Sequence, residues 1–133
     1  MHFLATIRDV NIARIIALVE EEPFGAVFEY GELGDLPSFL EDRRKSENDA
    51  PYECSLNFIM QIASGMKYLE NLSIPHRDLA ARNCIVNQNL LVKVSDHAMY
   101  CNKYDQEYYV DGCYTKIPLR WMAWEAVLLV RYR

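Results

Sequence analysis

The sequence lacks any apolar run close to the ~20 residues that a membrane-spanning helix needs. The run from Ile15 to Val19 is short, and Glu125 interrupts the apolar stretch near the C-terminus. The opening residues also lack the layout of a signal peptide. We therefore expect no membrane contact by this segment itself, and the anchor of a membrane-bound parent protein is expected outside this chain.

Paired cysteines are missing as well. Cys54, Cys84, Cys101 and Cys113 form no Cys-x-x-Cys pair, and no histidine stands at metal-ligand spacing from two of them. We expect neither structural zinc nor a disulfide framework, because reduced thiols fit a cytosolic domain better. Basic residues are also few: 14 Lys and Arg stand against 19 Asp and Glu, for a net charge of −5. A protein that binds a nucleic-acid backbone shows a basic face, so no nucleic-acid partner is expected.

The composition of the 133 residues, 51% apolar and 25% charged, is that of a globular domain. Two β-strands are predicted, from Ile15 to Val19 and from Ala26 to Tyr30, because a segment with Pro23 and Gly25 separates them. An isolated hairpin is marginal in water, so further sheet or a helix is expected beside this pair.

Helical patterns occupy much of the remaining chain. Residues 1 to 8 resemble the last turns of a helix, and a short helix through Leu36, Phe39 and Leu40 is expected after Asp35, its candidate cap. The strongest pattern runs from about Ser55 to Asn71. Its expected buried face consists of Leu56, Ile59, Ile62, Ala63, Met66 and Leu69.

The other expected elements are shorter. Strands are predicted around Cys84 to Val86 and Leu91 to Val94, with a turn between them, and a buried helix is predicted from Trp121 to Val130. Ser46 to Pro51 is polar and indicates a surface insertion. No internal repeat is present.

The segment from His76 to Asn83, followed by Asp96, contains the residue types that phosphoryl transfer requires. That reaction needs a positioned hydroxyl, neutralisation of developing charge, and magnesium held on oxygen ligands. Asp78 would accept the proton of the substrate hydroxyl. Asn83 and Asp96 would hold Mg²⁺ through an amide oxygen and a carboxylate, which are hard ligands that magnesium favours.

This segment, His-Arg-Asp-Leu-Ala-Ala-Arg-Asn, resembles the protein kinase signature H-R-D-L-x-x-x-N. It is similar to tyrosine kinases, because Ala80 stands where Ser/Thr kinases typically have Lys and Arg82 takes the alternative place near the transferred phosphate. The resemblance extends through Lys116 to Glu125. It implies that Asp78, Arg82 and Asn83 are the catalytic residues.

The resemblance also implies an α+β, protein-kinase-like fold that is present in part. The expected parts are the end of the αC helix, two small-lobe strands, the hinge and the first half of the mainly helical large lobe. Residues 1–28 would be a small-lobe remnant, 29–35 the hinge, and 36–133 a partial large lobe with the catalytic and activation loops. The Gly-rich loop and strand Lys of the family would lie upstream.

Among tyrosine kinases the chain resembles the discoidin domain receptors, which are collagen-sensing receptor kinases. Three segments carry this similarity: Gln61 to Leu69, Asp105 to Tyr109, and Arg120 to Glu125. Trp124 is informative within the last segment, because most kinases have Pro at that place.

The family resemblance assigns ATP and Mg²⁺ as cofactors and implies a nucleotide site. Phe28 would be the gatekeeper, and the main chain of Glu29, Tyr30 and Gly31 would form the hinge that binds the adenine edge. Asp35 is included among the nucleotide-binding residues. The alternative for the hinge is a plain edge strand and loop.

Five of the nine tyrosines fall between residues 100 and 114. Such a polar, tyrosine-rich segment is expected to be poor core material. The resemblance implies an activation loop that is phosphorylated at Tyr104, Tyr108 and Tyr109, with phosphate pairing to Arg77 or a nearby basic residue. The alternative is a set of amphipathic surface tyrosines.

The chain departs from the family pattern at Asp96-His97-Ala98, where kinases usually have Asp-Phe-Gly. The metal-binding Asp remains, but His97 replaces the Phe of the regulatory core and Ala98 restricts the backbone. His76, Arg77 and His97 are therefore candidate regulatory residues, although His97 also fits a satisfied core or surface histidine. Pro75 replaces the usual apolar residue and removes an N–H.

These features predict a fragment of a receptor protein tyrosine kinase that moves the ATP γ-phosphate to protein tyrosine. Its expected partners are ATP and tyrosine substrates, including its own activation loop, within a dimeric single-pass receptor at the cytoplasmic side of the plasma membrane. The isolated chain is expected to be inactive. The alternative is a pseudokinase-like ATP-binding or scaffolding module of a receptor, suggested by the altered Asp96-His97-Ala98 motif.

Overall fold

The computed structural model describes residues 7–46 and 52–128 of the chain. In order, its helices and strands are β1 (Ile15–Val19), β2 (Gly25–Phe28), α1 (Leu36–Lys45), α2 (Tyr52–Asn71), β3 (Cys84–Asn87), β4 (Leu91–Val94), β5 (Tyr109–Val110), β6 (Lys116–Ile117) and α3 (Trp124–Leu128). Short 3₁₀ turns connect several of them. The α+β fold class and its kinase-like order of elements are therefore confirmed.

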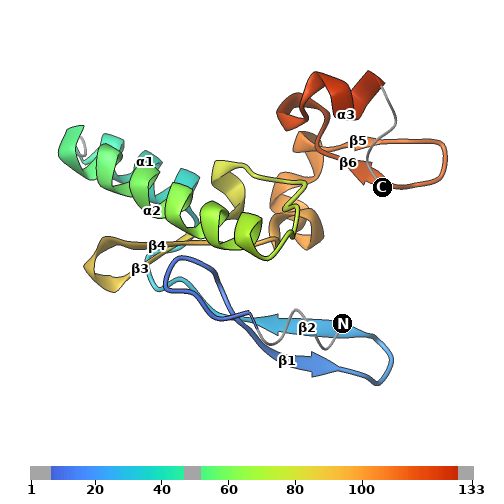
Figure 1. Ribbon diagram of the computed structural model, residues 1–133, viewed down its shortest axis with the longest axis horizontal. Helices are drawn as coiled ribbons and strands as arrows, with labels where there is room; N and C mark the ends of the chain where they lie inside the picture. Colours follow the sequence, from blue (N-terminus) through green and yellow to red (C-terminus); the bar gives the residue numbers. More distant parts are fainter. Residues whose placement is uncertain (1–6, 47–51, 129–133) are drawn as a thin grey trace.

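The strands of the described residues form three antiparallel pairs, β1–β2, β3–β4 and β5–β6. In the central pair, Cys84 lies opposite Val94 and Asn87 opposite Leu91. A parallel bridge from Ile12 to Val94 and an antiparallel bridge from Asp35 to Ile85 attach the flanking chain to this pair. The segment after β2 is thus held against β3 before α1 begins, as Figure 1 shows.

The main core lies where α1 and α2 cover the β3–β4 pair (Figure 1). Its buried members are Leu36, Phe39, Phe58, Cys84, Val86 and Val92. The rings of Phe39 and Phe58 meet edge to face with centroids 5.9 Å apart, which joins the two helices. Full burial of each large apolar side chain contributes about 1.5–3 kcal/mol, so this cluster holds α1 and α2 firmly against the β3–β4 pair.

A second cluster of Ile12, Leu69 and Val94 joins the C-terminal half of α2 to β4 and to the segment before β1. Gly65 makes this approach possible, because a Cβ atom built there would lie 2.7 Å from the Asn11 carbonyl oxygen. The Asn11 side chain continues the contact by donating to the Val92 carbonyl at 2.9 Å. The end of α2 is therefore fixed relative to β4.

Helix α1 begins and ends as its sequence predicts. Asp35 is the N-cap, and its Oδ1 accepts a hydrogen bond from the Ser38 N–H at 2.9 Å. Arg43, Arg44 and Lys45 occupy the last turn, where the helix dipole favours positive charge.

The expected buried face of α2 is wrong in part. The helix begins at Tyr52 rather than near Ser55, and Leu56 and Ile59 are 41% and 62% exposed. Ala63 is exposed as well. The buried positions are Phe58, Gly65 and Leu69, because the described contacts of α2 lie on the side that faces β4 and α1. The apolar residues of α2 therefore form a face that is wider than the surface by which the helix contacts β4 and α1.

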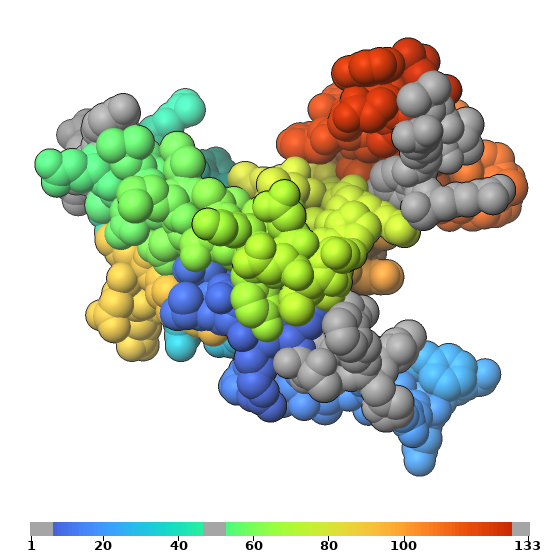
Figure 2. Space-filling model, in the orientation of Figure 1, coloured from blue at the N-terminus to red at the C-terminus, as the bar shows by residue number. Residues whose placement is uncertain are grey.

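The helix predicted from Trp121 to Val130 is present in part, but its predicted burial is wrong, and residues 129 and 130 lie outside the described residues. Helix α3 spans Trp124–Leu128, Trp121 belongs to the preceding 3₁₀ turn, and Trp124 and Leu128 are 70% and 71% exposed. Figure 2 shows the reason: the C-terminal part stands apart from α2 across a notch. Within residues 7–46 and 52–128 no helix or strand makes an extensive contact with α3.

Smaller differences concern the strand and segment boundaries. Strand β2 ends at Phe28, whereas the sequence predicted a strand as far as Tyr30. Ile7 and Arg8 are not helical, and the rest of the helix predicted for residues 1 to 8 lies outside the described residues. Most of the insertion predicted from Ser46 to Pro51 lies outside them too. No helix within residues 7–46 or 52–128 is long and apolar enough to cross a membrane.

Candidate active site

The loop between α2 and β3 carries the candidate catalytic residues, and His76 anchors it. The Nε2 atom of His76 lies 2.8 Å from the Ser95 carbonyl oxygen, and Nδ1 lies 3.2 Å from the Asp78 amide nitrogen. A proton on Nε2 satisfies both contacts, because the Asp78 N–H then donates to Nδ1. Arg77 between them adopts the left-handed backbone, with φ of 70°. The loop therefore turns sharply and presents Asp78 inward.

Asp78 is buried, with 4% of its surface exposed, and both of its carboxylate oxygens are occupied. Oδ1 accepts from Nη2 of Arg82 at 2.5 Å, while Oδ2 accepts from Nδ2 of Asn83 at 2.7 Å. The third donor is the hydroxyl of Tyr108, 2.5 Å from Oδ2. The structure thus brings the three predicted catalytic residues together, around a tyrosine from the predicted activation loop.

Arg82 lies at the centre of this cluster. Its Nε donates to the Tyr108 oxygen at 2.9 Å, and its guanidinium carbon lies 4.6 Å from the Tyr108 ring centroid and 4.1 Å from that of Trp121. Burial alone would lower the pKa of Arg82, but the hydrogen bond with Tyr108 and the charge of Asp78 raise it. Arg82 is therefore a permanent cation beside the Asp78 carboxylate.

The burial of Tyr108 contradicts the expectation that tyrosines of this segment would be poor core material. Tyr104 and Tyr108 are 9% and 6% exposed and form a cluster with Ala98. Burial and the hydrogen bond to Asp78 raise the pKa of Tyr108 to about 12, so its hydroxyl keeps its proton at neutral pH. Tyr109 is 57% exposed, as the surface alternative predicts. An amphipathic phenol can enter a polar site because its hydroxyl finds partners there.

The two predicted magnesium ligands differ in their surroundings. The Oδ1 atom of Asn83 accepts a hydrogen bond from the Ala98 N–H at 2.8 Å, and Asn83 is fully buried. Asp96 is exposed as a whole residue, but the protein around its carboxyl group partly removes it from water. This desolvation and the nearby charge of Asp78 raise the pKa of Asp96. The donor set fits magnesium in kind, because a carboxylate oxygen and an amide oxygen with a second lone pair are hard ligands.

A cavity of about 360 Å³ lies between the segment after β2 and the start of α1. All five predicted nucleotide-binding residues line it: Phe28, Glu29, Tyr30, Gly31 and Asp35. Gly34, Ile85 and His97 complete the lining. The imidazole Nδ1 of His97 lies 3.1 Å from Oγ of Ser95, and burial lowers the pKa of His97. His97 is therefore one of the residues that line this cavity. The sequence did not indicate this position for it.

The main chain along this cavity has free hydrogen-bonding groups. The Glu29 N–H donates to Arg14 and the Gly34 N–H to Gly31, whereas no main-chain hydrogen bond of the described residues uses the Glu29 carbonyl or the Gly31 N–H. The Glu29 side chain points to Lys93, 2.6 Å away. Such an edge, one carbonyl and one N–H, can bind a planar heterocycle by its rim.

Gly31 is the position where the cavity wall meets β3. A Cβ atom there would lie 2.8 Å from Cβ of Ile85 and 3.1 Å from the Gly34 oxygen. The close approach explains why this residue has no side chain and fixes the cavity edge to the catalytic half of the fold.

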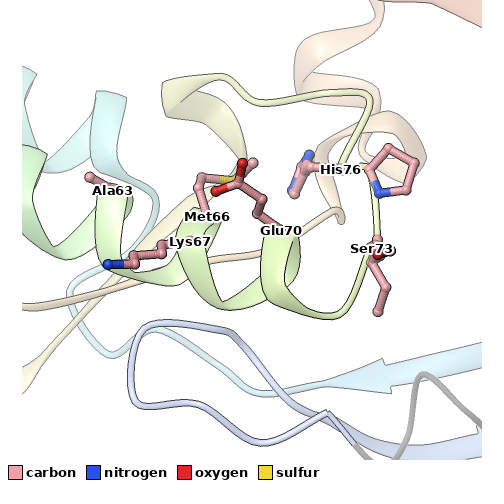
Figure 3. A pocket seen from close by; sticks show the side chains of 8 residues that line it. Ala63, Met66, Lys67, Glu70, Ser73 and His76 are labelled. Carbon is pink, nitrogen blue, oxygen red and sulfur yellow. The ribbon is translucent and has the colours of Figure 1, made fainter.

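A larger hollow, of about 680 Å³, lies on the other side of the loop. Figure 3 shows Met66, Glu70 and His76 around it, at the end of α2. It contains neither Asp78 nor the residues of the 360 Å³ cavity, so its size does not make it the reaction site.

The chain resembles known proteins along its whole length. The sequence profile of the family described as protein tyrosine and serine/threonine kinase matches residues 1–133. The human epithelial discoidin domain-containing receptor 1 is 36% identical over 145 residues, which cover 97% of this chain and 16% of the receptor. The Caenorhabditis elegans discoidin domain-containing receptor tyrosine kinase B is 37% identical over 131 residues, with the same coverage.

Other receptors are similar too. The Gallus gallus BDNF/NT-3 growth factors receptor is 40% identical over 123 residues, which cover 86% of this chain and 15% of the receptor. The chain therefore spans about 16% of the length of its discoidin relatives.

Proposed function

This chain belongs to the protein tyrosine and serine/threonine kinase family, among the receptor tyrosine kinases, and on that premise we propose that its parent protein transfers the γ-phosphate of ATP to protein tyrosine. The similarity to discoidin receptors extends the proposal to receptor signalling of the collagen-receptor type. The isolated chain is proposed to be inactive, because phosphoryl transfer needs groups that hold the phosphates, and neither the Gly-rich loop nor the strand Lys of the family is among its 133 residues.

One observation carries the proposal: the phenol hydroxyl of Tyr108 donates to the buried carboxylate of Asp78. A tyrosine side chain thus reaches the group that would accept the substrate proton, in buried surroundings where Asp78 and Arg82 satisfy its hydroxyl. A positioned carboxylate within hydrogen-bond reach is the geometry that general-base catalysis requires.

The proposed roles of the other residues follow from their places. Arg82 holds Asp78 and supplies positive charge where the transferred phosphate gains negative charge. Asn83 and Asp96 would hold Mg²⁺, which when bound neutralises charge on the phosphates. Phe28 and the main chain of Glu29 to Gly31 would contact adenine beside the cavity.

The domain division fits this assignment. We propose residues 1–28 as small-lobe remnant, 29–35 as hinge and 36–133 as partial large lobe. Tyr104, Tyr108 and Tyr109 are proposed phosphorylation sites, with Arg77 as a candidate phosphate partner. The proposed parent is a dimeric single-pass receptor with this segment at the cytoplasmic side of the plasma membrane.

A pseudokinase-like binding module is the second candidate, and the Asp96-His97-Ala98 motif favours it. The Ala98 N–H occupies one lone pair of Asn83, and His97 lines the proposed nucleotide cavity. These departures from the Asp-Phe-Gly pattern would suit a protein that binds ATP without turning it over, although Asn83 Oδ1 keeps its second lone pair for a metal.

The test is ATP-dependent tyrosine phosphorylation by the full intracellular region that contains this chain, with Asp78→Asn beside the wild type. We expect the wild type to phosphorylate a poly-Glu-Tyr substrate and the variant to lose roughly 10²–10⁴-fold in rate. ATP binding without phosphorylation in the wild type would favour the binding module. Activity that survives Asp78→Asn would overturn the role of Asp78.

A further inference from the structure

Asp35 belongs both to the wall of the 360 Å³ cavity and to the start of α1. Its Oδ1 caps the helix by accepting the Ser38 N–H. Its Oδ2 lies 2.7 Å from Nζ of Lys103, which is 68 residues further along the chain. Both oxygens of this cavity carboxylate are therefore engaged.

Lys103 reaches Asp35 from the proposed activation loop and has more than one contact there. Its Nζ also donates to Oγ of Ser38 at 2.5 Å and lies 5.0 Å from the Tyr104 ring centroid. These three contacts fix the position of the Lys103 side chain. A lysine that makes only one exposed ion pair is held much less firmly.

Two carboxylates of the cavity wall can be compared by the exposure of the lysines that pair with them. Glu29 and Asp35 are the carboxylates that line it, and each pairs with a lysine: Lys93 for Glu29 and Lys103 for Asp35. Lys93 is 12% exposed, whereas Lys103 is 50% exposed. Water can solvate Lys103 when it leaves, so its ion pair is the one that opens at low cost.

We propose that Lys103 competes with the ribose hydroxyls of a bound nucleotide for Asp35. In this state the contacts of Lys103 with Asp35 and Ser38, called here the Lys103 latch, hold the activation loop against the edge of the nucleotide cavity. A ribose whose hydroxyl donates to Oδ2 of Asp35 displaces Lys103. The inference rests on the proposed nucleotide site and adds a regulatory contact to it.

The latch also connects the nucleotide cavity with the catalytic carboxylate. Tyr104, next to Lys103, packs with Ala98 and Tyr108 in one cluster, and Tyr108 donates to Asp78. Release of Lys103 removes one of the contacts that keep this segment folded into the site. Nucleotide binding and withdrawal of Tyr108 therefore favour each other, because both need the segment to move.

The test compares the binding of ATP and 2′,3′-dideoxy-ATP, both with magnesium, by isothermal titration calorimetry on the full intracellular region. The variants are Lys103→Met and, as matched control, Lys116→Met. Lys116 pairs with Asp105 at 2.7 Å in the same loop, and Asp105, unlike Asp35, does not line the cavity. Because both nucleotides carry the same charge, the ratio of their dissociation constants cancels the general effect of losing a cation.

In Lys103→Met, Asp35 is free for the ribose, and we expect the preference for ATP over the dideoxy analogue to rise roughly tenfold. The control is expected to keep the wild-type ratio. An unchanged ratio in Lys103→Met, with ATP still bound, would refute the latch and leave the nucleotide site standing. Failure of ATP to bind wild type and both variants would refute the nucleotide site and the latch with it.

Trypsin cleavage after Lys103 gives a second measurement that does not depend on affinity. ATP at saturation should increase cleavage at this bond in the wild type, because the displaced side chain, half-exposed in the latch, becomes fully accessible. The dideoxy analogue at saturation should leave it nearly unchanged. Equal cleavage with both nucleotides would contradict competition through the ribose.

Discussion

The hydroxyl oxygen of Tyr108 lies 2.5 Å from Oδ2 of Asp78, although the two residues are 30 positions apart. Arg82 donates to both of them and holds the pair in place. The tyrosine therefore fills the position where the hydroxyl of a substrate would meet the proposed base. A substrate can reach Asp78 only after Tyr108 withdraws.

Replacement of Tyr108 by Phe removes the donor that occupies Asp78. We expect Tyr108→Phe to increase the initial rate of peptide phosphorylation several-fold before any autophosphorylation, because the carboxylate no longer holds the loop through a charged hydrogen bond. Initial rates on a tyrosine peptide measure this. Tyr109→Phe is the matched control, since Tyr109 is 57% exposed, and an equal increase in both variants would argue against occlusion by Tyr108.

The residues predicted for the catalytic loop lie together in the structure, and so do those predicted for the nucleotide edge. Asp78, Arg82 and Asn83 lie within six positions of each other, so a single turn brings them together, and the cap at Asp35 is a local feature of the same kind. The catalytic-loop residues also belong to the H-R-D-L-x-x-x-N signature. The order of elements from β1 to β4 could be predicted because it too depends on short-range sequence patterns.

Contacts that depend on tertiary packing could not be predicted in this way. Lys103 stands in a polar segment with no periodicity, and its partner Asp35 is 68 positions away. Tyr108 lies in the site because Arg82 and Asp78 satisfy the hydrogen-bonding needs of its hydroxyl. The polarity of the neighbouring residues in the sequence gives no sign of these distant partners. The exposure of Ile59 and Trp124 likewise depends on what packs against α2 and α3, not on their own patterns.

Gly31→Ala should destabilise the fold, because the new Cβ would lie 2.8 Å from Cβ of Ile85 in a packed edge. Overpacking of this kind costs about 1–3 kcal/mol in the free energy of unfolding. Urea denaturation of the full chain measures it. Gly112→Ala is the control: its Cβ meets nothing within 4 Å, so its stability should stay near that of the wild type or rise slightly. Equal losses in the two variants would contradict the close approach at Gly31.

The acid stability of the chain should depend on Asp35. Burial raises the pKa of Asp35, but the hydrogen bonds from Lys103 and Ser38 have the larger, opposite effect. The pKa of Asp35 is therefore lowered to about 2. The folded pKa is below the unfolded value of about 3.9, so ionised Asp35 stabilises the fold above about pH 4, and this contribution is lost as the pH falls toward 2.

Asp35→Asn tests this acid dependence, because Asn keeps the helix cap but cannot ionise. The urea midpoint of the wild type should exceed that of the variant at about pH 6, and the difference should shrink at about pH 3. A difference between the two midpoints that stays constant over this range would assign the effect of Asp35 to something other than its charge.

The ion pair of Arg82 and Asp78 should be costly to break from one side. Both side chains are nearly buried, at 3% and 4% exposed, and their atoms are 2.5 Å apart. Arg82→Met leaves the Asp78 carboxylate buried without its cation, at a cost on the order of 3–5 kcal/mol. The double variant Arg82→Met with Asp78→Asn removes both charges and should recover part of that loss. Urea denaturation of the wild type and the three variants gives the coupling between the two sites.

The pair Lys45 and Glu41 on α1 provides the contrast, because its side chains are 68% and 65% exposed. Lys45→Met should leave the urea midpoint close to that of the wild type, since water solvates the remaining carboxylate. If Arg82→Met were as mild as Lys45→Met, the Asp78 carboxylate would have to be reached by water, and the dry, preorganised site on which the proposed base depends would not exist.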